Sequence, residues 1–107
     1  MEIGGVPFDG FAWDSGNRDK CRKHGVSLAE IESLFVDGDP FVLPDTRHSL
    51  REQRLLAIGR SAGGRHLYVV FTMRQVGLEV LLRPISARYM HAKEVRAYAE
   101  ARARVQQ

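Results

Sequence analysis

Two very short connections in the second half of the chain constrain its fold most. Three segments have the apolar character of strands: Arg54–Arg60, Leu67–Met73 and Leu78–Ala87. They are joined only by Ser61–Gly64 and Arg74–Gly77, which contain turn-forming glycines. Parallel strands need a crossover of about a dozen residues or more, so connections this short require antiparallel hairpins. The sequence therefore predicts an antiparallel meander.

The first half predicts a short, irregular strand within Val6–Trp13, followed by two helices. Asp14 offers an N-cap for a polar helix over about Ser15–His24, which Gly25 closes in the left-handed conformation that suits glycine. This helix has almost no apolar face besides Cys21. We therefore expect it to lie on the surface, with Cys21 as a small buried hydrophobe.

The second helix has the clearest local signal in the chain. Ser27 and Glu30 form a capping box, in which the Ser27 hydroxyl accepts from the Glu30 amide while the Glu30 carboxylate reaches back to the Ser27 amide. The helix ends near Asp37–Pro40. Apolar residues at helical spacing predict that one face packs into the core: Leu28, Ile31, Leu34 and Phe35.

Helices followed by a meander predict an α+β fold. Phe41–Leu43 adds a short apolar strand, Pro44–Ser49 is a polar loop, and a terminal helix is expected over about His91–Val105. With 44% hydrophobic and 27% charged residues, the 107-residue chain has ordinary globular composition and room for one domain, residues 1–107. Disordered, collagen-like and transmembrane classes are excluded. Residues 1–15 do not resemble a signal peptide, so we expect a cytoplasmic location.

Basic residues concentrate in the second half. Residues 1–50 carry five basic and nine acidic side chains, whereas residues 51–107 carry 11 basic and four acidic ones. Arginine supplies 13 of the 16 basic residues, and its planar fork grips phosphate in a bidentate way. This distribution favours a polyanionic partner, although many soluble domains are as basic for solubility alone.

Three polar clusters are candidates for chemistry. Lys23 and His24 stand at the end of the first helix, where a basic residue also simply matches the helix dipole. A charged loop, of a kind that is usually solvated, contains the second cluster: Asp45, Arg47, His48, Glu52 and Arg54. The third surrounds Pro84 near the end of the last strand: Arg83, Ser86 and Arg88.

Arg83 is more informative than an average arginine. Strand alternation places it on one face with Glu79 and Leu81, while Leu78, Val80 and Leu82 take the other. An arginine between core-forming neighbours costs free energy unless an anion or a hydrogen-bonding group faces it. Pro84 cannot donate to a β-ladder, so it predicts an edge or a bulge at this point.

The available groups favour chemistry without a metal or cofactor. The four histidines, His24, His48, His66 and His91, have no HxxxH or HxH spacing, and Cys21 is the only thiol. Arginine, lysine, histidine and glutamate suit RNA cleavage in which the substrate's own 2′-hydroxyl attacks the neighbouring phosphate. The same groups also suit passive RNA binding, so residue types alone leave both readings open.

Motifs from Phe11 to about Glu100 follow one another in a specific order: Phe11-Ala12-Trp13-Asp14, Lys23-His24-Gly25-Val26-Ser27, Asp45-Thr46-Arg47-His48-Ser49, Glu52-Gln53-Arg54, Ile58-Gly59, Ile85-Ser86-Ala87-Arg88, Glu94 and Tyr98. Together they resemble the BrnT toxin family. The resemblance implies a RelE-like fold, in which a short N-terminal strand and two helices pack on a small antiparallel sheet of about four strands, with a C-terminal helix.

The resemblance also implies function and partners. It implies the toxin of a type II toxin–antitoxin system, an endoribonuclease that cleaves RNA without a metal and inhibits translation. A cognate BrnA-like antitoxin of ribbon-helix-helix type would neutralise it and would supply the only contact with DNA, and no membrane is involved.

The candidate roles combine the residue chemistry with this resemblance. Arg83 and Arg88 would hold the phosphate and the transition-state charge, Arg54 would orient the phosphate, and Trp13 and Asp14 would be structural. The catalytic candidates are His24, His48, Glu52, Arg54, Arg83 and Arg88, with His48 or Glu52 as the base, and the RNA-binding candidates are Lys23, Arg47 and Ser86. The alternative is an inactive RNA-binding or antitoxin-binding module that acts in transcriptional autoregulation.

Overall fold

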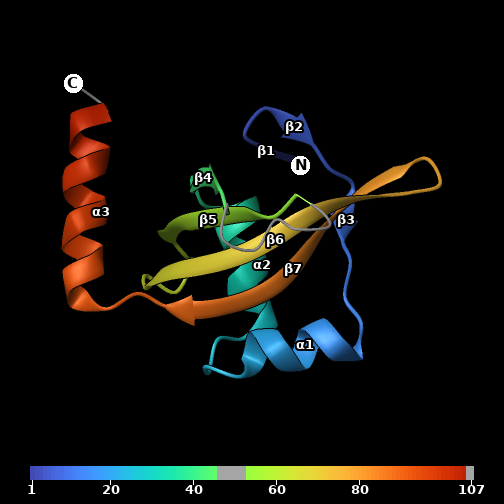
Figure 1. The fold of residues 1–107 in the computed structure, drawn as a ribbon, viewed down its shortest axis with the longest axis horizontal. Coiled ribbons are helices and arrows are strands. Elements are labelled where there is room, and N and C mark those ends of the chain that lie inside the picture. The colour runs from blue at the N-terminus through green and yellow to red at the C-terminus, as the bar shows by residue number, and fades with distance from the viewer. Residues whose placement is uncertain (46–52, 106–107) are drawn as a thin grey trace.

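The computed structural model describes residues 1–45 and 53–105, which form an α+β fold (Figure 1). The elements in chain order are β1 (Glu2–Ile3), β2 (Val6–Pro7), β3 (Gly10–Phe11), α1 (Ser15–Arg22), α2 (Leu28–Val36), β4 (Phe41–Pro44), β5 (Leu55–Arg60), β6 (His66–Val76), β7 (Glu79–Tyr89) and α3 (Ala92–Val105). β1 and β2 pair with each other, and the remaining strands form one sheet in the order β3-β7-β6-β5-β4. None of the described helices is both long and apolar enough to cross a membrane.

The predicted antiparallel meander is confirmed, since β4 to β7 pair antiparallel in sequence order. The sheet gains a fifth strand because β3 pairs parallel to β7, through Gly10 with Leu81 and Phe11 with Leu82. The irregular first strand is thus split between β2 and β3. β6 and β7 run further than their apolar segments, because each strand satisfies the other's backbone groups where the hairpin extends beyond the rest of the sheet (Figure 1).

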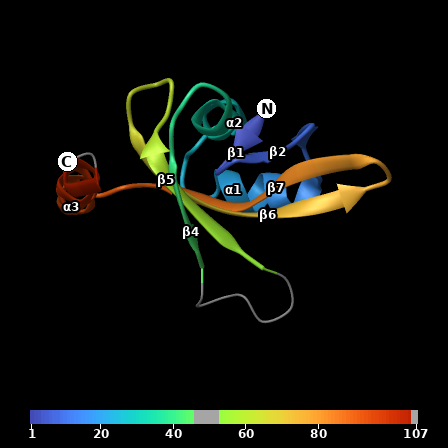
Figure 2. The same cartoon turned by 90° about the horizontal axis from the view of Figure 1, so that it is seen from above.

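The sheet is covered unequally. α1, α2 and the β1–β2 hairpin all lie on one side of it, and α3 stands beside one end (Figure 2). On the covered side, α2 buries Leu34 and Phe35, and the Phe35 ring meets the Phe71 ring edge-on with centroids 5.1 Å apart. Gly59 permits close packing, because a Cβ there would lie 3.0 Å from Leu34 Cδ1 and 3.0 Å from the Cα of Pro40. We refer to the other side as the open face.

α1 lies at the surface as predicted, and its N-cap is confirmed. The Asp14 carboxylate accepts from the Asn17 amide at 3.1 Å, and the Asn17 side chain accepts from the Asp14 amide at 2.7 Å. The helix ends at Arg22 and not at His24, because the chain turns early: the amide of Gly25, at φ +84°, donates to the Arg22 carbonyl at 2.9 Å. Gly25 adopts the expected left-handed conformation.

One of the two hydrogen bonds predicted for the capping box of α2 is present. The Ser27 hydroxyl accepts from the Glu30 amide at 3.1 Å, as predicted. The return contact is wrong, because the Glu30 carboxylate accepts instead from the hydroxyls of Ser61, at 2.7 Å, and Tyr89, at 2.5 Å. Ser61 directly follows β5 and Tyr89 is the last residue of β7, so Glu30 ties α2 to the end of two strands rather than to its own helix start.

Candidate active site

A bulge in β7 decides which side chains reach the open face. Phe71 of β6 pairs with Pro84, and the preceding Val70 pairs with Ser86, so Ile85 is the extra residue. The irregularity that Pro84 predicts is therefore present, as a bulge. In a regular strand, residues five apart face opposite sides. The extra residue reverses this alternation.

Arg83, Ser86 and Arg88 consequently share one face. They pair with Thr72, Val70 and Tyr68 of β6, respectively. The core face of the same pairing holds Leu82 and Ala87, both buried. The bulge thus lets one strand present two arginines and a serine to the open face without placing a charge in the core.

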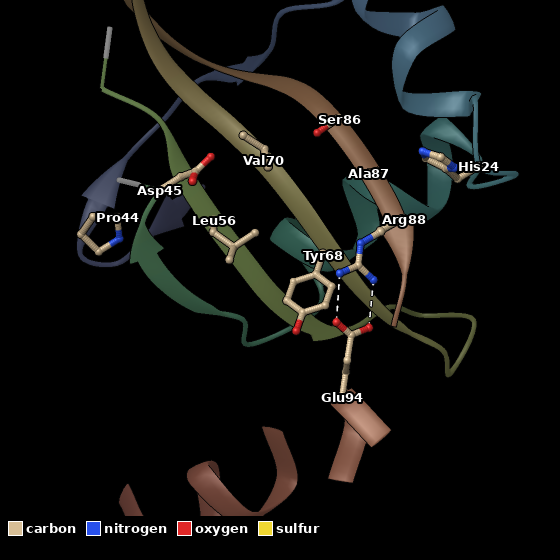
Figure 3. Close-up of a pocket in the computed structure, with 10 residues that line it drawn as sticks. All are labelled: His24, Pro44, Asp45, Leu56, Tyr68, Val70, Ser86, Ala87, Arg88 and Glu94. Carbon is tan, nitrogen blue, oxygen red and sulfur yellow. Dashed lines mark hydrogen bonds and ion pairs between the residues drawn. The ribbon is translucent and has the colours of Figure 1, made fainter. Parts of the chain in front are cut away.

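A cavity of about 590 Å³ lies on the open face near the end of β7 (Figure 3). Tyr68, Ser86 and Arg88 belong to its lining, and apolar side chains from β5 and β6 line part of its wall. His24, which follows α1, and Asp45, which follows β4, lie on opposite sides of the cavity in this view. Four separate parts of the chain therefore supply polar groups to the cavity: the hydroxyl of Tyr68, the imidazole of His24, the carboxylate of Asp45 and the guanidinium of Arg88.

Arg88 is held in place on three sides. Its Nη1 and Nη2 atoms donate to the two carboxylate oxygens of Glu94 in α3, each at 2.9 Å, and Nη1 also donates to the carbonyl of Tyr89 at 3.2 Å. The guanidinium carbon lies 4.3 Å from the centre of the Tyr68 ring. The fork of Arg88 is thus oriented for two parallel hydrogen bonds, the arrangement by which arginine binds carboxylate and phosphate.

The ionisable groups of this cluster shift one another's pKa values. Hydrogen bonds from Arg88, followed by the bond from the His91 amide, lower the pKa of Glu94 to about 2. The bond to Glu94 raises the pKa of Arg88. Burial, and then the charge of Glu94, raise the pKa of Tyr68. At neutral pH, Arg88 and Glu94 are both charged and Tyr68 keeps its proton.

Arg83 faces an anion, as its position in the strand requires. Its Nη1 atom lies 2.7 Å from Oδ2 of Asp14, and the Arg83 side chain is only 18% exposed. The hydrogen bond from Arg83, ahead of that from the Asn17 amide, lowers the pKa of Asp14. Asp14 therefore caps α1 and neutralises Arg83 at the same time.

Asn17 joins α1 to the bulge. Its side-chain amide donates to the carbonyl of Pro84 at 2.8 Å and to the carbonyl of Ala12 at 2.9 Å. Asn17 is 5% exposed and its bond to Pro84 is buried, so this bond satisfies a backbone carbonyl that water does not reach. The bulge is thereby anchored to the start of α1, beside the Asp14–Arg83 pair.

The structure divides the candidates predicted from sequence between two cavities. His24, Asp45, Ser86 and Arg88 line the first one, whereas Arg54 and Arg83 line a second cavity next to it on β7. Lys23, the C-cap of α1, is exposed and belongs to neither lining. Arg47, His48 and Glu52 lie outside the described residues.

Sequence reasoning missed two members of the site. Tyr68 appeared only as part of a strand, and strand alternation could have placed it on the face of Val70, opposite the buried Leu67 and Val69. The sequence points to Glu94 only through the family resemblance. Its contact with Arg88 joins a strand to a helix across a turn, which no periodic pattern predicts.

Cys21 is buried in α1 and fully inaccessible to solvent, as predicted. Burial raises the pKa of its thiol to about 11, so the reactive thiolate is scarce at neutral pH. Among the described residues, no three His, Cys, Asp or Glu side chains are grouped so that they could hold a metal ion.

Comparison with known proteins identifies one family. Residues 13–94 match the family described as the ribonuclease toxin BrnT of type II toxin–antitoxin systems. The match includes every residue of the three polar clusters. No curated protein matches the chain.

Proposed function

Because the chain belongs to the BrnT family of ribonuclease toxins of type II toxin–antitoxin systems, we propose that it is a metal-independent endoribonuclease that binds its substrate on the open face of the sheet. The observation that carries this proposal is the position of Arg88. Its fork is oriented between an aromatic ring and a carboxylate, inside a cavity that also holds a hydroxyl and an imidazole.

The proposed reaction is an internal transfer within the RNA chain. The 2′-oxygen attacks the adjacent phosphorus while a base takes its proton, and the bond from phosphorus to the 5′-oxygen breaks as an acid protonates that oxygen. The products are a 2′,3′-cyclic phosphate and a 5′-hydroxyl. The negative charge that develops on the phosphate oxygens needs fixed cationic donors.

Arg88 is the proposed donor to these oxygens. A phosphate offers two oxygens in the same arrangement as the Glu94 carboxylate, so substrate would replace Glu94 at the Arg88 fork. Ser86 would donate to the same phosphate, and the Tyr68 ring offers a surface on which a nucleobase can stack. His24 is the one imidazole among the described residues of this cavity and would assist proton transfer. His48 or Glu52 stays the proposed base.

The test is cleavage of RNA by the purified protein in excess EDTA. We expect wild-type protein to produce fragments with 5′-hydroxyl ends, and Arg88→Ala to cut at least about 100-fold more slowly, as when one transition-state donor is removed. Arg96→Ala is the matched control, because Arg96 is an exposed arginine of α3 outside the cavity. A substrate with a 2′-deoxynucleotide at the cut site should resist cleavage, because it lacks the 2′-hydroxyl that attacks the phosphorus.

Two results would contradict the proposal. Intact RNA with the wild-type protein would remove the catalytic role and favour a module that binds RNA or the antitoxin without cleaving. Equal rates for Arg88→Ala and Arg96→Ala would remove Arg88 from the reaction.

We further propose that the protein acts in the cytoplasm, where cleavage inhibits translation, and that a BrnA-like ribbon-helix-helix antitoxin neutralises it. Membership of a type II family supports an antitoxin partner. Expression of the chain alone should stop protein synthesis, and expression with the neighbouring gene product should restore it. DNA should bind the complex only, because the ribbon-helix-helix partner would make the DNA contacts. Growth unaffected by the chain alone would contradict the toxin role.

A further inference from the structure

A second cavity, of about 270 Å³, lies beside the bulge, between α1 and the open-face side chains of the sheet. Four cationic side chains line it, and each comes from a different part of the fold: Lys20 from α1, Arg54 from the position just before β5, Arg74 from β6 and Arg83 from β7. Among the described residues, its lining contains no carboxylate. An anion in this cavity would interact favourably with all four cations at once.

Part of the lining of this cavity is held by hydrogen bonds. Asn17 and Ile85 belong to its lining, and Asn17 is the buried residue that holds the bulge carbonyl of Pro84 at 2.8 Å. The contact of Arg83 with Asp14, at 2.7 Å, uses Nη1 alone, whereas a guanidinium has five N–H donors. Arg83 is thus oriented by one carboxylate at the cavity edge and keeps the donor capacity to bind a second anion.

The two cavities follow one another along β7. Arg83 lines the second and Arg88 the first, and their partners on β6, Thr72 and Tyr68, are four residues apart. At the rise of a β-strand, the two arginines lie about 13 Å apart along the strand direction. A polymer with regularly spaced phosphates can therefore reach both.

We propose that this second cavity binds a backbone phosphate of single-stranded RNA, one that flanks the phosphate held at Arg88. The inference rests on the proposed function, because it takes RNA as the ligand of the first cavity. The two cavities differ in chemistry: the first includes the Tyr68 ring, whereas the described lining of the second has no aromatic side chain. The second cavity therefore contributes affinity without reading the base.

The test is binding of an RNA oligonucleotide whose 2′-positions are methylated, so that cleavage cannot occur. Lys20→Ala and Arg74→Ala remove exposed side chains of the second cavity, and Arg96→Ala removes an exposed arginine outside it. Fluorescence anisotropy over a range of KCl concentrations gives the affinity and its salt dependence. Circular dichroism melting checks that each variant is folded.

We expect Lys20→Ala and Arg74→Ala each to weaken binding about three- to tenfold at low salt. Each should also reduce the slope of log K against log[salt] by about 0.7, the value for one contact to a single-stranded phosphate. The loss should be the same for uridine and adenosine oligonucleotides, and Arg96→Ala should bind as wild type does. Inorganic phosphate should compete far more weakly than the oligonucleotide, because it occupies one cavity only.

Three outcomes decide between this site and the proposed function. Wild-type affinity and salt slope in both Lys20→Ala and Arg74→Ala would overturn the proposed phosphate site in the second cavity. The proposal of cleavage at Arg88 would be unaffected. Weakened binding in these variants, together with a wild-type protein that never cleaves RNA, would support the second cavity and reject the nuclease. A wild-type protein that does not bind the oligonucleotide would overturn both.

Discussion

The guanidinium of Arg88 and the carboxylate of Glu94 form two parallel hydrogen bonds of 2.9 Å, which join the last strand of the sheet to the helix beside it. The Glu94 Oε1 atom also accepts from the amide of His91, at 2.9 Å, at the start of α3. Glu94 therefore has two separable roles: it neutralises Arg88 through its charge and supports the helix start through its oxygen.

Glu94→Gln separates these roles. The amide oxygen of glutamine can still accept from the His91 amide, but the negative charge that competes with phosphate at Arg88 is gone. We expect this variant to bind 2′-methylated RNA about two- to fivefold more tightly, the range of a partly exposed ion pair. Glu100→Gln, at an exposed position of the same helix, should bind as wild type does. Unchanged or weaker binding by Glu94→Gln would show that Glu94 does not compete with the substrate.

The same pair predicts a pH dependence in acid. The pKa of Glu94 in the folded protein is about 2, below its ordinary value of 4.5, because Arg88 and the His91 amide stabilise the charged form. A carboxyl group with a lowered pKa stabilises the fold fully above its unfolded pKa and loses this contribution as the pH falls. The stability difference between wild type and Glu94→Gln should thus be constant from pH 8 to about 5 and shrink between about 4.5 and 2. Thermal unfolding of both proteins measures it, and a Glu94 carboxyl that titrates near 4.5 by NMR would contradict it.

Asn17 should be a structural residue of large effect. Asn17→Ala removes the donors to the carbonyls of Ala12 and Pro84, and the bond to Pro84 is buried. A buried carbonyl without a partner costs about 1–3 kcal/mol in the free energy of unfolding. Asn17→Asp should lose at least as much, because its carboxylate would face the two carbonyls and Asp14. Urea denaturation measures both variants, and a loss below about 0.5 kcal/mol in Asn17→Ala would show that water replaces the amide.

Cys21 should be unreactive in the folded protein. With the pKa of its thiol at about 11 instead of 9.0, the thiolate fraction at pH 8 falls about 100-fold, and the side chain is also inaccessible. Iodoacetamide should label the chain in 6 M guanidinium chloride and leave the native protein unmodified over the same period, as mass spectrometry will detect. Cys21→Ala should retain RNA cleavage. Loss of cleavage in a folded Cys21→Ala variant would indicate that the thiol takes part in the reaction.

Local signals predicted the local structure well. Short connections identified the hairpins, Asp14 and Ser27 identified the helix starts, and Pro84 predicted an irregularity that is a bulge. The parallel pairing of β3 with β7 could not be predicted, since it joins residues about seventy positions apart and consists of only two residue pairs. Local patterns carry no information about contacts at such separation.

The candidate site was predicted by residue type more than by arrangement. The place of Arg83 in the strand predicted that an anion faces it, and this anion is Asp14. The sequence marks Asp14 only as a helix cap, which does not predict a contact with a residue 69 positions away. The phase of Arg88 relative to Arg83 depends on the extra residue at Ile85, which alternation alone cannot locate. The two arginines therefore looked like one cluster in the sequence and occupy two cavities in the fold.

The bulge also gives β7 a spare residue. Ile85 has no partner on β6, so a chain one residue shorter at this point could pair in unbroken alternation and still place Arg83 and Arg88 on the open face. A chain one residue longer would need a second irregularity or would turn one arginine toward the core. Natural variation in length at this strand should therefore be one-sided, with single deletions tolerated and single insertions excluded.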